Sequence, residues 1–166
     1  VILAGAAARA DLSAFTPGVK AAFLVPLVLS TAATAWGFHE ALDIRTERVV
    51  IETDRLPDNV ERVRICQLSD VHLGSIVREE RLARMLDVVK RENPDLLVST
   101  GDLVDGRLAQ LPGLLEQFRE IRPALGKVAV TGNHEFYVGL DGALAFTKDA
   151  GFDVLRGEVR DVGGVL

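Results

Sequence analysis

The chain has little of what a disulfide-stabilised or nucleic-acid-binding protein uses. It contains one cysteine, Cys66, so no disulfide can form within it, and the redox compartment stays undetermined. Cys66 lies in an expected strand with no general base beside it, which favours packing over a nucleophilic role. Acidic residues outnumber basic ones, 24 against 19. This balance argues against general nucleic-acid binding, which needs a basic face to neutralise phosphates.

Charged residues are also missing from one long stretch near the N-terminus. Residues 21–38 are 18 uncharged side chains in a row, and as a helix they would span roughly 27 Å, close to the thickness of a bilayer core. Trp36 and Phe38 would then lie near one interface. We interpret 19–42 as a transmembrane helix with its juxtamembrane flank, which predicts a protein anchored in the cell membrane. A cleaved signal peptide and a soluble buried helix are the alternatives, and basic residues on both flanks leave the orientation open.

The remaining sequence divides by composition. Residues 1–18 form an apolar segment, which is either the end of an earlier membrane helix or a plain extension. A linker is expected over 43–59, with a strand at 47–52 followed by a turn, and a mixed α/β domain over 60–166. The chain does not begin with methionine and its last residues follow an expected strand. We therefore interpret it as a fragment of a longer protein.

Within the domain, short apolar runs alternate with amphipathic helices. The expected strands cover 62–68, 95–100, 127–131, 152–155 and 158–162. The expected helices cover 79–92, 111–121 and 142–150. Strands that alternate with helices in this way are typical of a parallel sheet, and the run at 95–100 is apolar on both faces, as in a buried strand.

Each of the first three strands leads into a short polar motif. The motifs are Ser69-Asp70-Val71-His72, Gly101-Asp102 and Gly132-Asn133-His134-Glu135. Their spacing is close to one strand-loop-helix-loop unit, so they should meet at the same edge of one sheet. Singly, each residue is explained as a helix cap, a turn former or a loop histidine. Their recurrence at three successive strand ends, with two of the three histidines in the chain, favours a metal site.

The residue types in these motifs suit a pair of divalent ions. Asp70 and His72 are two apart, so an extended backbone would point both to the same side. Asp102 has two oxygens and could bridge two ions, while Asn133 could serve the second ion without adding negative charge. Carboxylate, imidazole and amide donors together suit Mn, Fe or Zn better than Ca. His134 could then act on the leaving oxygen as a general acid, or stabilise charge in the transition state.

In order and spacing, the three motifs resemble the opening motifs of the calcineurin-like metallophosphoesterases, over residues 60 to about 162. With the hydrophobic helix before them, they are similar to the membrane-anchored phosphoesterases of bacteria. The resemblance implies the N-terminal half of a four-layer αββα sandwich, preceded by a membrane helix. It also implies hydrolysis of phosphomonoesters or phosphodiesters by metal-bound hydroxide. The resemblance leaves the substrate open; the apolar anchor favours a lipid-linked or envelope phosphate, with a nucleotide as the alternative.

The same resemblance assigns roles to the motif residues. It implies that Asp70 and His72 bind the first metal, that Asp102 bridges, that Asn133 binds the second metal and that His134 is catalytic.

Two further residues and the second half of the site are less certain from the sequence. Asp105 and Glu135 are expected to support the site or the fold, with surface placement as the alternative. The family completes its site with more histidines, including a Gly-His-x-His motif, and no histidine follows His134. We therefore expect the fragment to be inactive and its parent active. The alternative functions are a membrane-tethered scaffold that keeps the fold without catalysis, and a soluble ligand-binding domain.

Overall fold

The computed structural model describes residues 18–74, 77–106 and 112–162. It separates into two compact units, Val1–Arg45 and Thr46–Leu166, and each is treated by itself. The expectations for residues 1–17 lie outside the described residues.

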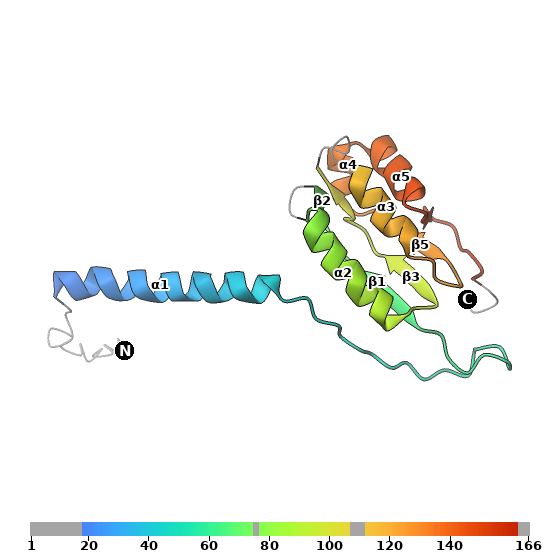
Figure 1. Cartoon of the computed structure of the whole chain (residues 1–166), viewed down its shortest axis with the longest axis horizontal. Coiled ribbons are helices and arrows are strands. Elements are labelled where there is room, and N and C mark those ends of the chain that lie inside the picture. The colour runs from blue at the N-terminus through green and yellow to red at the C-terminus, as the bar shows by residue number, and fades with distance from the viewer. Residues whose placement is uncertain (1–17, 75–76, 107–111, 163–166) are drawn as a thin grey trace, which may run out of the picture. The chain divides into compact units, whose positions relative to one another are not determined.

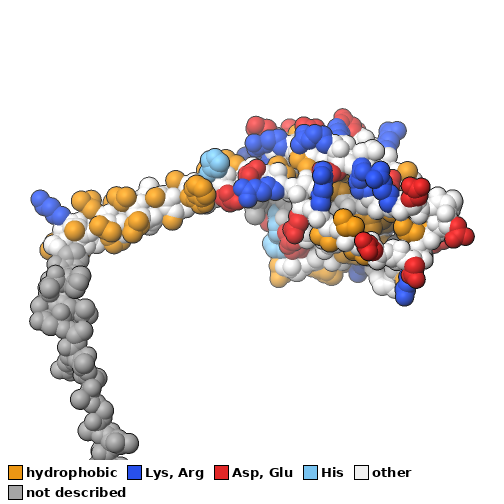
Figure 2. Space-filling view, turned by 90° about the horizontal axis from the view of Figure 1, so that it is seen from below, with side chains coloured by type: hydrophobic (Ala, Val, Ile, Leu, Met, Phe, Trp, Pro, Cys, Tyr) orange, Lys and Arg blue, Asp and Glu red, His pale blue; other side chains and the backbone are white. Residues whose placement is uncertain are grey.

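The first unit contains one long helix, α1 (Val19–Leu42). By length and composition α1 could cross a membrane. None of its residues is buried, and apolar side chains follow one another along its surface (Figure 2). The apolar N-terminal helix expected from the sequence is therefore confirmed as a helix, including Pro26 in its interior.

The segment that opens the second unit is irregular. The strand expected at 47–52 does not form: Val49, Val50 and Ile51 are 75%, 87% and 83% exposed, and no strand pairs with them among the described residues. A run of β-forming residues needs a neighbouring strand to satisfy its backbone, and sequence pattern alone cannot supply one. The turn after it is present, with Val60 N donating to Pro57 O at 2.8 Å.

Two parallel sheets organise this unit (Figure 1). The larger has the strand order β1-β3-β5-β6. Its strands are β1 (Ile65–Leu68), β3 (Leu96–Ser99), β5 (Lys127–Ala129) and β6 (Asp153–Val154). The smaller pairs β2 (Leu73–Gly74) with β4 (Val104–Asp105). This arrangement confirms the expected α/β class with parallel sheets.

Four helices accompany the sheets. They are α2 (Glu79–Glu92), α3 (Pro112–Glu120), α4 (His134–Val138) and α5 (Leu140–Asp149). In α2, Leu82, Leu86 and Val89 are buried, as an amphipathic helix requires, and the helix ends at Glu92, with Asn93 as its C-cap before Pro94. Helices α2 and α3 pack against each other, as do α4 and α5 (Figure 1).

The core forms where the helices meet the larger sheet. Leu68, Leu97 and Ala129 come from three successive strands and pack with Leu86 of α2 and Phe118 of α3. Strand β3 is buried on both faces, as its composition predicted. The sheet is thereby fixed in place under the loops that follow its strands.

Several details of the elements differ from expectation. The strand expected at 127–131 ends at Ala129, so Val130 lies beyond it and is 43% exposed. No strand forms at 158–162. Helix α5 starts after Gly139 rather than after Asp141. Helix α4 was not foreseen, because its five residues are too few to show a helical period.

A buried lysine lies at the amino end of the larger sheet. Lys127 begins β5, and its Nζ donates to the carbonyl oxygens of Phe118 at 2.7 Å and Ala150 at 2.6 Å. It therefore satisfies carbonyl groups near the ends of α3 and α5. Burial lowers the pKa of Lys127 to about 8, with the nearby positive charges of Arg122 and Arg119 contributing.

Candidate metal centre

The loop residues at the carboxyl end of the larger sheet have an unusual backbone. Asp70, His72 and Asp102 have φ values of 53°, 53° and 50°, in the left-handed region. Among the described residues, Asn93 at the end of α2 is the other non-glycine residue with positive φ. Left-handed backbone is costly for L-residues and is often retained at functional sites. The expected extended backbone between Asp70 and His72 is therefore wrong.

The loops after β1 and β3 run beside each other beyond the sheet. Asp70 N donates to Gly101 O at 3.2 Å, and His72 N donates to Asp102 O at 3.0 Å. The same pattern continues into the β2–β4 pair. The three left-handed residues thus lie within a continuous hydrogen-bonded ladder that connects the two sheets.

The loop after β5 approaches the loop after β3 closely enough to require glycine. A Cβ on Gly101 would lie 2.8 Å from Gly132 N, and a Cβ on Gly132 would lie 2.7 Å from Asp102 N. Both distances are shorter than normal carbon contacts. With no side chains between the loops, Asp102 Oδ1 accepts a hydrogen bond of 2.8 Å from His134 N.

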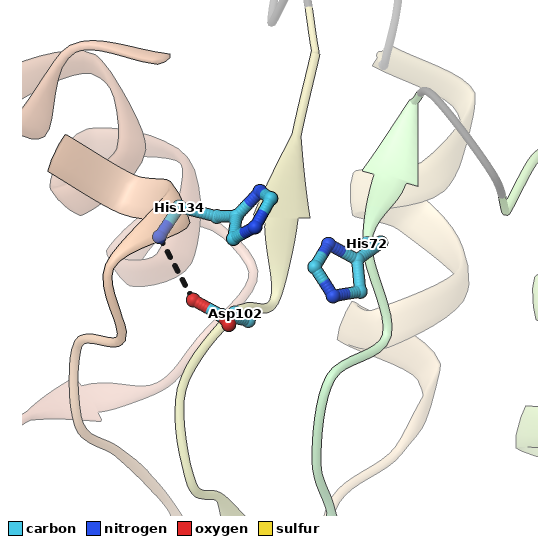
Figure 3. Close-up of side chains that lie close together, drawn as sticks. All are labelled: His72, Asp102 and His134. Atoms are coloured by element: carbon cyan, nitrogen blue, oxygen red, sulfur yellow. Dashed lines mark hydrogen bonds between the residues drawn. The ribbon is translucent and has the colours of Figure 1, made fainter. Parts of the chain in front are cut away.

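These approaches bring three side chains together: His72, Asp102 and His134 (Figure 3). One potential ligand atom from each lies within 4.8 Å of the others. The two imidazole rings meet edge to face, with centroids 4.4 Å apart. All three residues are half-buried, so the cluster is accessible to a ligand.

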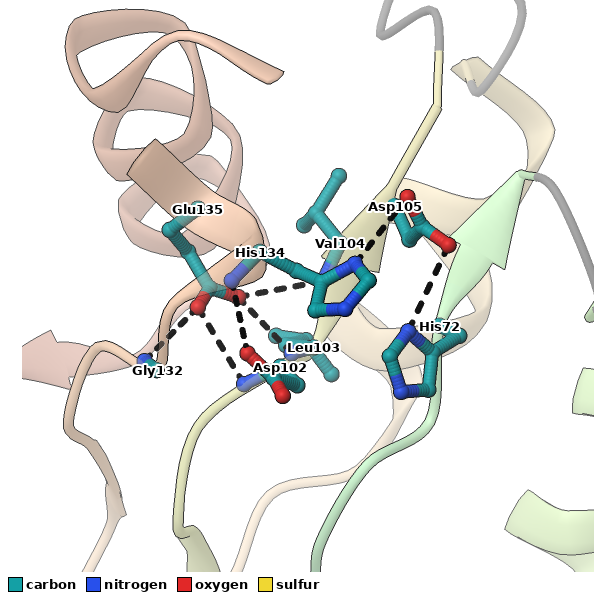
Figure 4. A network of polar contacts seen from close by, with 8 residues as sticks. All are labelled: His72, Asp102, Leu103, Val104, Asp105, Gly132, His134 and Glu135. Atoms are coloured by element: carbon teal, nitrogen blue, oxygen red, sulfur yellow. Dashed lines mark hydrogen bonds and ion pairs between the residues drawn. The ribbon is translucent and has the colours of Figure 1, made fainter. Parts of the chain in front are cut away.

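Asp105 lies against both histidines (Figure 4). Its carboxylate oxygens are 3.4 Å from His72 Nδ1 and 3.2 Å from His134 Nδ1. Neither approach has hydrogen-bond geometry, and both Nδ1 atoms are buried without a partner. Because Nδ1 of each ring faces a carboxylate, Nε2 is the nitrogen left for a ligand. Asp105 is therefore half-buried beside the cluster, in contact with both histidines.

Glu135 is buried, with 3% of its surface exposed. Its carboxylate accepts four backbone hydrogen bonds, from Asp102 N, Leu103 N, Val104 N and Gly132 N (Figure 4). The sequence left this role undetermined, because a lone glutamate after a turn is usually exposed. Gly132, three residues earlier, permits close backbone approach and was the available signal.

Two of the expected ligands lie outside the three-residue cluster. Asp70 is exposed, and its carboxylate accepts a hydrogen bond from Ser69 Oγ. Asn133 is also exposed, and its backbone oxygen accepts from Phe136 N and Tyr137 N at the start of α4. Metal binding by these two residues, like catalysis by His134, stays a prediction.

The donor set fits a divalent transition metal. Two imidazoles and a carboxylate are typical ligands for such ions. Two of the three residues, His72 and Asp102, are also in a strained backbone conformation. Sequence reasoning did not single out Tyr137, whose exposed ring meets the His134 ring edge to face at 5.4 Å.

Comparison with known proteins decides the family. The family model for calcineurin-like phosphoesterases matches residues 63–160, which include all three motifs. The chain belongs to this family. An uncharacterized metallophosphoesterase of Aquifex aeolicus is 46% identical over 132 residues, which are 80% of this chain and 50% of that protein.

Other relatives are more distant. A Danio rerio "transmembrane protein with metallophosphoesterase domain" is 29% identical over 80% of this chain and 31% of its own length. The crystal structure of Pseudomonas putida nuclease MPE aligns with a TM-score of 0.41 and 23% identity, over 55% of this chain and 47% of that chain. This calcineurin-like phosphoesterase chain thus spans about half the length of its Aquifex aeolicus relative, and less of the Danio rerio one.

Proposed function

We propose that this calcineurin-like phosphoesterase hydrolyses phosphomonoesters or phosphodiesters with the help of divalent metal ions. The observation that carries the proposal is the cluster of His72, Asp102 and His134, of which the first two are proposed as metal ligands and the third as the catalytic residue. Three loops that are distant in sequence bring these side chains together at the carboxyl edge of a parallel sheet, the usual place for a binding site in such folds.

The metal ligands we propose are Asp70, His72, Asp102 and Asn133, with two ions among Mn, Fe and Zn. Divalent ions there would supply Lewis acidity, which activates water and stabilises charge that develops on a phosphate. We propose that Asp102 binds both ions. The hydrogen bond from His134 N is made to its Oδ1 and not to its Oδ2. Asp70 and Asn133 are exposed and follow the same strands as His72 and His134, which is why we propose them as further ligands.

His134 is proposed as the catalytic residue. Asp105 faces its Nδ1, which favours a proton on that nitrogen and orients the ring. Nε2 is then directed away from Asp105, and can donate to or accept from an oxygen of the substrate when the ring is protonated or neutral, respectively. The backbone of His134 is fixed to Asp102, so the ring stays beside the proposed metal ligands.

Helix α1 is proposed to anchor the protein in the cell membrane, on a side left open. Its length, its composition and its lack of buried residues support this role. A relative from Danio rerio is itself named a transmembrane protein. An anchored phosphoesterase meets lipid-linked or envelope phosphates at the highest local concentration, and we propose these before nucleotides as substrates.

We also propose a domain organisation. In it, 60–166 forms the N-terminal half of a four-layer sandwich, with 43–59 as the linker to α1. A second half would then complete the metal ligands, and the chain alone should bind metal weakly.

The test is a Mn²⁺-supplemented assay of the full-length protein with bis-p-nitrophenyl phosphate. We expect hydrolysis, and a loss of roughly 1000-fold or more in kcat/KM for Asp102→Ala. Asp87→Ala, on the exposed side of α2, is the matched control and should keep full activity. Activity undiminished in Asp102→Ala would reject the assignment, and a folded protein inactive with Mn, Fe and Zn would favour a non-catalytic scaffold.

A further inference from the structure

The buried carboxylate of Glu135 joins two loops of the site. Its Oε2 accepts from Asp102 N at 3.1 Å in the loop after β3, and from Gly132 N at 2.7 Å in the loop after β5. Its Oε1 accepts from Leu103 N at 2.8 Å and Val104 N at 3.2 Å, both after β3. One side chain thus makes hydrogen bonds that cross from one loop to the other.

These hydrogen bonds restrict the relative positions of Asp102 and His134, two residues of the proposed site. Glu135 follows His134 directly, so fixing its carboxylate to the amide of Asp102 limits how far His134 can move. From the other side, Asp102 Oδ1 accepts from His134 N at 2.8 Å. Glycines at positions 101 and 132 allow this contact, because a Cβ at either would meet the opposite backbone.

We propose that Glu135 is a positioning residue: its carboxylate sets the distance between Asp102 and His134 by holding their two loops together. The proposal rests on the proposed function in taking these two residues as parts of the site. Glu135 acts through the backbone, and it is the hydrogen bonds to four N–H groups that compensate its burial.

The number of acceptors makes Glu135→Gln a sharp test. A glutamine side chain has the same shape but one acceptor oxygen, so in either orientation two of the four amides face an NH₂ group. We expect hydrogen exchange in the full-length protein to become roughly ten to a hundred times faster at those amides, among 102–104 and 132. Amides in β1 and α2 should keep their wild-type exchange rates.

A second readout measures the effect on the site itself. Mn²⁺ alone, titrated by calorimetry into the full-length protein, should bind about tenfold or more weakly to Glu135→Gln. Glu135→Asp keeps the charge with a shorter reach, so it should recover part of that affinity. Glu80→Gln, which changes an exposed carboxylate in α2, is the matched control and should alter neither measurement.

Three results would overturn the proposal. The first is exchange in the wild-type protein that is as fast at amides 102–104 and 132 as in the irregular segment 46–62, and its measurement does not depend on a variant that folds. The second is hydrogen exchange in Glu135→Gln that becomes faster to the same extent across the whole domain. It would show that Glu135 stabilises the fold in general instead of positioning these two loops. The third is an unchanged Mn²⁺ affinity in Glu135→Gln, which would show that Glu135 does not affect the metal site. Absence of hydrolysis with the expected exchange and Mn²⁺ results would reject the phosphoesterase function and leave the positioning role intact.

Discussion

The two ends of the larger sheet use their polar residues in opposite ways. At the amino end, Lys127 donates to two carbonyl groups near helix ends, and Arg64 Nη1 donates to Glu92 O at 2.6 Å at the end of α2. Arg64 N also donates to Asp95 Oδ2 at 2.7 Å. Each of these backbone groups thereby has a hydrogen-bond partner that it would otherwise lack in the folded protein.

At the carboxyl end, polar residues are held in arrangements that the fold alone does not favour. Asp70, His72 and Asp102 have left-handed backbone, and the Nδ1 atoms of two histidines lack hydrogen bonds. Such costs persist where the surrounding structure fixes the conformation, and they are frequent at functional sites. The comparison teaches that polar residues at one end of the sheet maintain the fold, whereas the other end holds the residues proposed to carry out the chemistry.

The largest effect that separates the two ends is on catalysis. His134→Ala removes the proposed acid and should lower kcat of the full-length protein by about 100-fold or more. Its free energy of unfolding should change by no more than about 0.5 kcal/mol, because the ring is half-buried and its Nδ1 makes no hydrogen bond. Steady-state kinetics and urea unfolding measure both quantities. Lys127→Met is the control from the amino end and should leave kcat unchanged; equal losses in both variants would remove the distinction.

The next effect is on stability as a function of pH. The pKa of Lys127 is about 8 in the folded protein, against 10.5 as its ordinary value. Between these pH values the unfolded chain binds the proton more strongly, so folding becomes more favourable as the pH rises. Relative to Lys127→Met, the free energy of unfolding of the wild type should increase by up to about 3 kcal/mol.

Urea unfolding at pH 7 and at pH 10.5 measures this difference. Lys148→Met, which alters an exposed lysine of α5, is the matched control and should follow the wild-type pH dependence. Parallel curves for wild type and Lys127→Met would mean that the lysine keeps its ordinary pKa in the folded protein.

The smallest effect concerns the strained backbone. Asp70→Gly should raise the free energy of unfolding by roughly 0.5–1 kcal/mol, because glycine adopts φ of 53° without steric cost. Asn93, the C-cap of α2, also has a left-handed backbone conformation. Asn93→Gly should raise the free energy of unfolding by less, because asparagine tolerates this conformation better than most residues. Urea unfolding of the two variants gives both values. Destabilisation by Asp70→Gly would show that the Ser69–Asp70 contact outweighs the strain.

The sequence was informative wherever a long periodic or apolar pattern was present. Helix α2 and strand β3 followed from their apolar residues, and the spacing of the three motifs correctly brought His72, Asp102 and His134 to one edge. The family assignment followed from the same motifs and is confirmed.

What the sequence missed depends on contacts between distant segments. The left-handed backbone at Asp70 and His72 comes from the ladder with the loop after β3, which no local pattern encodes. Burial of Glu135 requires four amides from two loops. The exposed run at 49–51 has the composition of a strand, but no partner among the described residues.

The left-handed residues also bear on any effort to stabilise this protein. A search for stabilising substitutions ranks non-glycine residues with positive φ high, since glycine there is usually beneficial. Asp70, His72 and Asp102 would all be selected by that criterion. The easiest gains in thermostability would therefore remove the groups proposed to bind metal, so a variant library should leave these three positions unchanged.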